Sequence, residues 1–256
     1  MIAALPMYDR AENRAATDRY WSLIRSALST RGIDAPVALN RGAAELMPQW
    51  TDPSLLLSQT CGFPYRARLF GHVQLVGTPD FGVDGCLPGY YRSVLIARAD
   101  DSRDGLAAFD GGTLAYNDAM SQSGWAAPQN HAAQWGLALG AGPCTGSHSA
   151  SLAAVAGGKA DLAAIDAVTW SLLAEHDPLA AAVKVICMTD PTPGLPYITA
   201  GDRDSGAIFD AISEAIALLD ATERKALRLN GIVRISAEAY LSVPVPAPPT
   251  VFAPNK

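Results

Sequence analysis

Two serines and a glycine stand close together in the stretch Asn117–Trp125, which reads NDAMSQSGW. Serine hydroxyls and the unpaired N–H groups at a helix start donate hydrogen bonds to an oxyanion, and the positive end of the helix dipole adds to the attraction. A glycine lets a ligand approach the backbone closely. Serine is also a preferred helix cap. The stretch therefore predicts either an ordinary cap or an anion-binding turn built from Ser121, Gln122 and Ser123.

A second segment repeats this arrangement. Ser147, His148 and Ser149 open a predicted helix over Ser149–Ala156. The positive end of a helix disfavours imidazolium, so we expect His148 to act as a neutral donor or acceptor. The alternative is a histidine that lies on the surface or caps the helix.

Other polar side chains follow predicted strands. Asp166 comes after the apolar run Leu162–Ile165, at the strand end where open α/β sheets bind ligands, and it is equally suited to cap the next helix. Gln59 and Thr60 end an apolar run that begins at Ser54. Tyr90 and Tyr91 begin another strand, where only one of the two should face a ligand because side chains alternate along a strand. Packing in the core is the alternative for both tyrosines.

The elements that would hold these side chains follow from apolar periodicity. The first 80 residues alternate strand and helix, including a stripe of period 3.6 over Glu12–Ser29, which predicts a mostly parallel sheet flanked by helices. After a glycine-rich crossing at Asp80–Gly89 a second α/β unit begins. Its predicted strands are Tyr91–Ala97, Thr113–Tyr116 and Leu162–Ile165, its helices are Ser102–Phe109, Trp125–Leu139, Ser149–Ala156 and Val168–Glu175, and Gly140–Ser147 is a loop.

Three segments are less regular. Pro128 falls about one turn into the predicted helix Trp125–Leu139, so that helix should start irregularly or later. Val37–Leu39 is strand-like and Ala43–Trp50 is helix-like. The tail Val243–Pro254 carries five prolines and is expected to form an extended strap.

Composition narrows the classes of protein. Of 256 residues, 49% are hydrophobic and 17% are charged, which is enough for a sizeable core. A net charge of -6 without a basic cluster argues against nucleic-acid binding. No apolar run has the length of a membrane span, and the chain opens without the pattern of a signal peptide, so we expect a cytoplasmic protein unless a leader lies outside this sequence.

The cysteines predict neither a metal site nor a cofactor site. Cys61, Cys86, Cys144 and Cys187 lack zinc spacing, and no nucleotide-binding or metalloprotease motif is present. We expect buried free thiols, with a Cys61–Cys86 bridge as the alternative for an exported protein.

Taken in order, the motifs resemble the substrate-binding component of phosphate, phosphite or phosphonate ABC transporters, which has the type II periplasmic binding protein fold. The resemblance rests on Asn117-Asp118 with Ser121-Gln122-Ser123-Gly124 and Pro128, on Gly146-Ser147-His148 with Ala154-Val155, on Gly158-Lys159-Ala160-Asp161 with Ala164-Ile165-Asp166, and on Thr192-Pro193 with Leu195-Pro196.

The resemblance implies two hinge-connected α/β lobes that close over a ligand. Lobe I would comprise residues 1–84 and 187–256, lobe II residues 85–186, and the hinge would lie near Gly82–Gly89 and Val185–Pro191. Ser121, Gln122, Ser123 and His148 would hold an oxyanion. Asp166 would meet an amine or accept a proton, and Tyr91 or Tyr90 would match a tyrosine near the crossing.

Two departures from the family pattern leave the ligand class broad. Gln122 stands where the family often has threonine, and Gln59, Thr60 and Cys61 stand where its first lobe has an aromatic residue. We therefore expect capture of a small oxyanion or zwitterion in a cleft between the lobes, for uptake by an ABC permease.

By the resemblance the protein would be a periplasmic monomer that performs no chemistry. One alternative is a cytoplasmic ligand sensor on the same fold. The other is an enzyme in which Ser121 or Ser123, His148 and Asp166 form a nucleophile, base and orienting acid.

Overall fold

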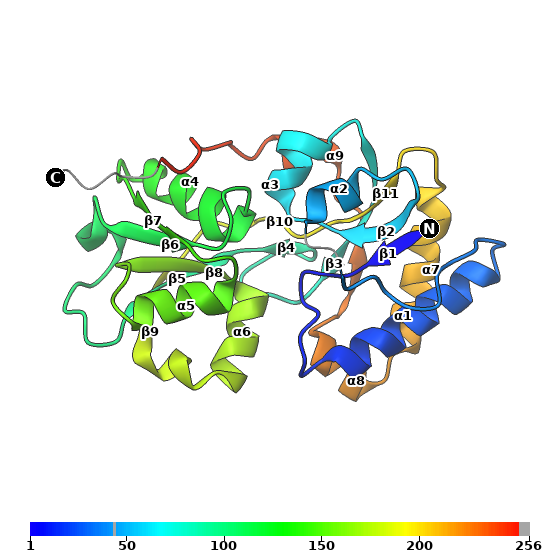
Figure 1. Ribbon diagram of the computed structural model, residues 1–256, viewed down its shortest axis with the longest axis horizontal. Helices are drawn as coiled ribbons and strands as arrows, with labels where there is room; N and C mark the ends of the chain where they lie inside the picture. Colours follow the sequence, from blue (N-terminus) through cyan, green and yellow to red (C-terminus); the bar gives the residue numbers. More distant parts are fainter. Residues whose placement is uncertain (43–44, 251–256) are drawn as a thin grey trace. The chain divides into compact units, whose positions relative to one another are not determined.

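Two α/β units make up the computed structural model, which describes residues 1–42 and 45–250 (Figure 1). Unit 1 comprises Met1–Tyr90 and Pro193–Ser242, and unit 2 comprises Tyr91–Thr192 with residues 243–250 of the tail. Both crossings thus fall later than the expected boundaries after residues 84 and 186, and the tail, expected in the first lobe, belongs to unit 2.

Unit 1 is built on a five-stranded sheet in the order β1-β2-β11-β3-β12. Its strands are β1 Ile2–Ala4, β2 Leu55–Gln59, β3 Val73–Asp80, β11 Tyr197–Ala200 and β12 Gly231–Val233. Its helices are α1 Arg14–Ser29, α2 Leu46–Trp50, α3 Gly62–Pro64 with the π-helical turn η1 Tyr65–Leu69, α7 Ser205–Leu218, α8 Ala221–Leu227 and α9 Ala237–Leu241.

The helices of unit 1 cover both faces of its sheet (Figure 1). The stripe predicted near Glu12–Ser29 is confirmed, because Ile24 and Leu28 of α1 are fully buried in one core with Ile212 of α7. Trp50 and Tyr240 belong to a second core that also contains Leu55 and Ile198 of the sheet. Burying each of these large apolar side chains contributes roughly 1.5–3 kcal/mol, which holds the strand ends in fixed positions.

Unit 2 has the sheet order β7-β6-β8-β5-β9. Its strands are β5 Ser93–Arg98, β6 Thr113–Tyr116, β7 Gly140–Cys144, β8 Leu162–Asp166 and β9 Val183–Met188. Its helical elements are the 3-10 turn η2 Leu106–Phe109, the π-helical turn η3 Gln122–Ala126, α4 Ala127–Gln134, α5 His148–Ala156, α6 Ala167–His176 and the 3-10 turn η4 Pro178–Ala182.

Both sheets are mixed, which corrects the expectation of mostly parallel pairing. β6 pairs in parallel with β7 and β8, whereas β5 lies antiparallel to both β8 and β9. In unit 1, β11 lies antiparallel to β2 and β3. β5 and β11 are the strands that the chain enters directly after each passage between units, so no crossover helix forces them to run parallel to their neighbours.

Two predicted elements of the sequence differ in the structure. Gly140–Ser147 was expected to be a loop, but Gly140–Cys144 forms the edge strand β7, where Pro143 is tolerated because an edge strand has one free side. Val37–Leu39 is not a strand, although Asn40 N–H donates to the carbonyl of Ala3 at 2.7 Å. Of the helix predicted over Ala43–Trp50, residues 43 and 44 lie outside the described chain and the rest forms α2.

Two other predicted helices are shorter in the structure. The helix expected over Ser102–Phe109 is reduced to η2. The helix expected over Trp125–Leu139 starts as the π turn η3 and becomes regular only at Ala127. Pro128 lies in the first turn of α4, where its missing N–H costs no hydrogen bond.

The proline-rich tail is held against unit 2 as far as it is described, to residue 250. The indole Nε1 of Trp125 donates to the carbonyl of Ala247 at 3.0 Å, and the side-chain amide of Asn130 donates to the carbonyl of Pro244 at 2.9 Å. These bonds to backbone carbonyls explain why the strap belongs to unit 2. Residues 251–254 of the predicted strap lie outside the described chain.

The passages between the units pair with each other as the two-residue strands β4 Tyr90–Tyr91 and β10 Thr192–Pro193. Beside them the N–H of Gly194 donates to the carbonyl of Gly89 at 2.8 Å. A Cβ at Gly194 would lie 2.5 Å from that carbonyl oxygen, so a larger residue would push the two segments apart.

Two further expectations concern a disulfide bridge and a membrane-spanning helix. Cys61 and Cys86 are both free thiols, so the alternative of a bridge between them is not realised in this structure. Among residues 1–42 and 45–250, no helix is long and apolar enough to cross a membrane.

Candidate functional site

One edge of the unit 2 sheet collects most of the predicted site residues. β6, β7 and β8 run parallel, so the turn after β6, the start of α5 after β7 and Asp166 at the end of β8 share that edge. β5 starts there, with Ser93 directly opposite Asp166. The carboxyl edge of parallel strands is where open α/β sheets bind ligands.

Ser121 is the N-cap of the π-helical turn. Its hydroxyl oxygen accepts a hydrogen bond from Gly124 N–H at 2.9 Å, and its carbonyl accepts from Ala126 N–H at 3.0 Å. The capping interpretation is therefore correct for Ser121. Its hydroxyl proton is not used by the cap, and its role as a donor to a ligand stays a prediction.

Ser123 meets His148 across this edge. The Ser123 hydroxyl lies 3.0 Å from His148 Nε2, and Ser123 is 2% exposed. Burial lowers the pKa of His148 to about 4, because a desolvated imidazolium is disfavoured, while the backbone of Ala164 acts weakly in the opposite direction. At neutral pH His148 is thus an uncharged partner of Ser123 because it is buried, whereas the expectation of a neutral ring was based on its place at a helix start.

Two backbone donors are open at the same helix starts. Among the described residues, the N–H groups of Ser123 and His148 have no hydrogen-bond acceptor. Each belongs to the first turn of a helix, where N–H groups lack an internal partner and the dipole is positive. The hydrogen bond between Ser123 and His148 uses one proton of that pair, so the arrangement offers the two N–H groups and at most one further proton from the hydroxyl or the ring, which suits an anion.

Ser93 and Thr189 support the turn from the neighbouring strands. The Ser93 hydroxyl donates to the carbonyl of Ser123 at 3.0 Å. The N–H of Ser93 donates to Thr189 Oγ1 at 2.9 Å, and Thr189 N–H returns a bond of 2.9 Å to the Ser93 carbonyl. Neither Ser93 nor Thr189 was predicted from the sequence. The one feature of the sequence that could have indicated Ser93 is its place as a polar residue at the start of the apolar run SVLIA.

Gly124 and Asn117 are packed tightly at the base of the turn. A Cβ at Gly124 would lie 1.9 Å from Oδ1 of Asn117 and 3.2 Å from the hydroxyl of Ser121. Oδ1 of Asn117 is buried and has no hydrogen-bond partner among the described residues. The glycine is thus required by space rather than by its backbone angles.

Asp166, Gln122 and Tyr91 lie in the same unit in less open positions. One carboxylate oxygen of Asp166 caps α6, accepting from Val168 N–H at 2.8 Å and Thr169 N–H at 3.0 Å, and the residue is 2% exposed. The amide of Gln122 reaches Thr192 Oγ1 at 3.5 Å. Tyr91 is buried. Asp166 thus has the capping role, and its ligand role stays a prediction, as do those of Gln122 and Tyr91.

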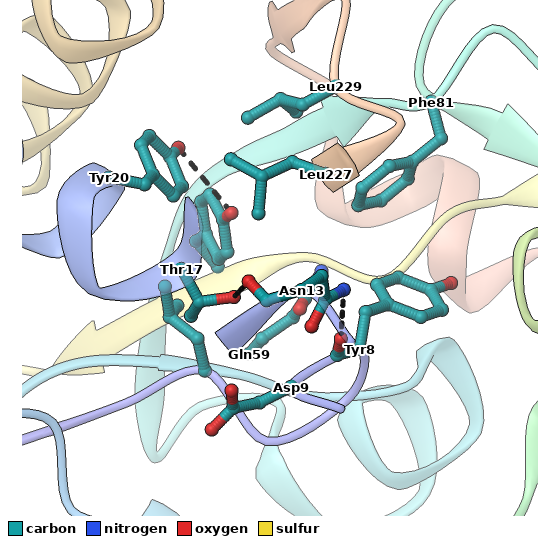
Figure 2. Close-up of a pocket in the computed structure, with 11 residues that line it drawn as sticks. Tyr8, Asp9, Asn13, Thr17, Tyr20, Gln59, Phe81, Leu227 and Leu229 are labelled. Carbon is teal, nitrogen blue, oxygen red and sulfur yellow. Dashed lines mark hydrogen bonds between the residues drawn. The ribbon is translucent and has the colours of Figure 1, made fainter. Parts of the chain in front are cut away.

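Unit 1 contains the remaining predicted residues. Gln59 donates from its amide to the carbonyl of Leu195 at 3.1 Å, Thr60 is fully buried, and Tyr90 is half-buried in β4. Gln59 lines a pocket together with Tyr20 and Tyr197 (Figure 2).

That pocket is small and uncharged at its aromatic side. Burial raises the pKa of Tyr197 to about 12 and that of Tyr20 well above its usual value, so both hydroxyls stay protonated. The ring of Tyr8 packs edge-on against the ring of Phe81, and the two ring centroids are 4.8 Å apart (Figure 2). The pocket has a volume of about 30 Å³, and its lining holds the carboxylate of Asp9 but no Lys, Arg or His among the described residues, so the donor set of unit 2 is the stronger candidate for an anion.

Metal binding has no support in the described part of the chain. Within residues 1–42 and 45–250 no group of three His, Cys, Asp or Glu side chains comes together as a metal site.

The family comparison matches most of the chain. Residues 69–240 match the family described as "ABC transporter, phosphonate, periplasmic substrate-binding protein". A comparison with curated protein sequences finds no match.

Several solved structures share the fold at low sequence identity. PhnD1 from Prochlorococcus marinus, in complex with methylphosphonate, has a TM-score of 0.70 at 16% identity over 93% of this chain and 94% of that one. XAC2383 from Xanthomonas citri, bound to chloride, has a TM-score of 0.68 at 16% identity over 93% and 92%. A binding protein component of a phosphonate ABC transporter (PA3383) from Pseudomonas aeruginosa has a TM-score of 0.64 at 17% identity over 93% and 82%.

Proposed function

The chain belongs to the periplasmic substrate-binding proteins of phosphonate ABC transporters, and on this basis we propose that it captures a small phosphonate-like oxyanion at the turn Ser121–Gly124. The observation that carries the proposal is the Ser123–His148 pair at 3.0 Å, beside the open N–H groups of both residues. An anion bound there would receive hydrogen bonds from two helix starts, without a positively charged side chain.

The acidic character of the protein does not oppose this ligand. The net charge is -6, but local N–H groups and helix dipoles determine the potential at the turn. The uncharged state of His148 also suits a reversible carrier, because a buried ion pair with the ligand would carry a large desolvation cost.

We propose that the protein performs no chemistry on its ligand. A general base works best with a pKa near the operating pH, and the pKa of His148 is about 4. Among the described residues no carboxylate contacts Nδ1 of His148, and the backbone of Ala164 is the one polar group that acts on the ring from that side, so no acid orients the ring as in a catalytic triad. Asp166 instead caps α6.

The transport role implies a partner and a location, which we propose from family membership. The protein would act in the periplasm as a monomer and deliver its ligand to an ABC permease. Cell fractionation of the native producer tests the location, and a protein recovered only from the cytoplasm would contradict it. Light scattering of the purified protein tests the monomer.

Isothermal titration calorimetry tests the ligand class. Phosphate, phosphite, methylphosphonate, an aminophosphonate and sulfate are titrated separately, and at least one should bind with a micromolar or lower Kd. Ser123→Ala should weaken that binding by about 1–3 kcal/mol, because a hydrogen bond to a charged group is lost. If no anion binds, the proposed ligand class is wrong; if Ser123→Ala binds as tightly as the wild type, Ser123 has no part in the site.

A further inference from the structure

A proline-rich strap, residues 243–250, lies along the helix that follows the turn Ser121–Gly124. It has the sequence VPVPAPPT and forms neither helix nor strand. An extended proline-rich backbone has no internal hydrogen bonds, so its carbonyls can accept from other groups. The carbonyl of Ala247 accepts from Trp125, and that of Pro244 accepts from Asn130. The later donor thus meets the earlier strap residue, so the strap runs antiparallel to the helix.

Trp125 joins this strap to the turn. It lies two residues after Ser123 in the five-residue π turn η3 and is 4% exposed. Its ring packs against the ring of Tyr116 at the end of β6, and the two ring centroids are 5.1 Å apart. The side chain is therefore fixed by β6 through its ring and by the strap through its Nε1.

The backbone hydrogen bonds of η3 do not by themselves fix how the turn is wound. The carbonyl of Ser121 accepts from Trp125 N–H at 3.2 Å and from Ala126 N–H at 3.0 Å, which are the bonds of an α-helix and of a π-helix. Because π turns are rare, contacts outside the backbone must select this winding. The hydroxyl of Ser93 fixes the carbonyl of Ser123, and the strap fixes Trp125. A displacement of Trp125 would rotate the backbone at Ser123, and hydrogen bonds weaken steeply as their angle falls.

We propose that the strap is a positioning element of the oxyanion site, and that docking of the strap and binding of the anion strengthen each other. The proposal rests on the proposed function of the turn. Trp125 and Asn130 are positioning residues in it, since they act through η3 and not on the ligand. An anion held by the N–H of Ser123 stabilises the winding that keeps Trp125 bonded to Ala247. The two effects are equal in size, because coupling between two binding events is reciprocal.

Exchange of the Trp125 indole proton with solvent, measured by NMR on the full chain, tests this coupling. The resonance is identified by its nuclear Overhauser contact with the ring of Tyr116. The probe is methylphosphonate, or the anion of the calorimetric series that binds more tightly. At saturation it should slow the exchange about fivefold or more, the lower end of typical couplings. Trp21 is a matched control in unit 1, because its indole also donates to a backbone carbonyl, that of Pro36 at 3.2 Å, and its exchange should stay unchanged.

Calorimetry with the same anion tests the coupling in the opposite direction. Trp125→Phe combined with Asn130→Ala removes both donors to the strap and keeps an aromatic ring beside Tyr116. This double variant should bind the anion more weakly by the factor found in the exchange measurement. Val245→Ala is a matched control on the strap, because the side chain of Val245 is 60% exposed, and its Kd should equal that of the wild type. If the double variant does not fold, the exchange measurement on the wild type decides.

The outcomes separate this proposal from the function on which it rests. If the wild type binds no anion of the series, the proposed function fails and the coupling fails with it. If an anion binds but the exchange at Trp125 is unchanged, or slows equally at Trp21, the coupling alone is overturned. A folded double variant that binds the anion as tightly as the wild type also overturns the coupling and leaves the oxyanion site in place.

Discussion

Acidification should destabilise the protein through His148 in a defined pH window. Burial holds the pKa of His148 at about 4, below the ordinary value of 6.5. As pH falls below 6.5, the unfolded chain binds a proton that the folded protein does not accept until about pH 4. The stability present at neutral pH is therefore lost across this window. The shift corresponds to about 3 kcal/mol of unfolding free energy.

Urea unfolding followed by circular dichroism measures this loss. The wild type and His148→Gln are compared at several pH values between 7 and 4. Glutamine keeps a polar group within reach of Ser123 but does not titrate, so the variant should lose much less stability than the wild type as pH falls. Carboxylates with lowered pKa values, such as Asp101 at about 2, act below this window and affect both proteins alike.

A matched control replaces the exposed His176 by glutamine and is measured over the same pH range. A difference in unfolding free energy between the wild type and His148→Gln that stays constant from pH 7 to pH 4 would contradict a lowered pKa of His148. That result would mean that His148 is solvated and titrates normally, and its neutral role beside Ser123 would have to be abandoned.

Three further substitutions test the packing around the turn. Gly124→Ala should weaken methylphosphonate binding at least tenfold in calorimetry, because its Cβ would lie 1.9 Å from Asn117 Oδ1; adding Asn117→Ala should restore part of it, and strictly additive losses would contradict the clash. Ser93→Ala should lower the unfolding free energy by about 1–3 kcal/mol in urea, since the carbonyl of Ser123 loses its donor; an unchanged value would show that the turn is held by other contacts. Trp125→Phe removes the indole donor to Ala247 and should speed proteolysis of the tail, whereas cleavage at the wild-type rate would show that this bond does not hold it.

The turn and its histidine were accessible to sequence reasoning because their signals are local. A strand end, two serines and a glycine lie within ten residues, and the helix start at His148 repeats the pattern. The contact between Ser123 and His148 was not predicted; in the folded chain it arises because the parallel strands β6 and β7 precede the two residues. The position of Pro128 correctly predicted that the helix after the turn starts irregularly, and this irregular start is the π turn η3.

The supporting residues could not be predicted, because their partners are distant along the chain. Ser93 holds the carbonyl of Ser123 and meets Thr189, and no local pattern indicates either contact. The edge strand β7 was not predicted, because its two glycines and its proline are typical of a loop. The tail joins unit 2 through the side-chain donors of Trp125 and Asn130. Only the folded chain brings these side chains close to the tail, so the sequence did not indicate the contact. The pairing of Asp166 with the first turn of α6 could be anticipated, but not its burial.

A crystal structure of the protein with methylphosphonate tests the central claim most directly. We expect a phosphonate oxygen within about 2.7–3.2 Å of the Ser123 hydroxyl or its N–H, and another at the same range from the N–H or Nε2 of His148. A methylphosphonate bound elsewhere, with the Ser123–His148 contact unchanged at 3.0 Å, would contradict the assignment of this turn as the binding site.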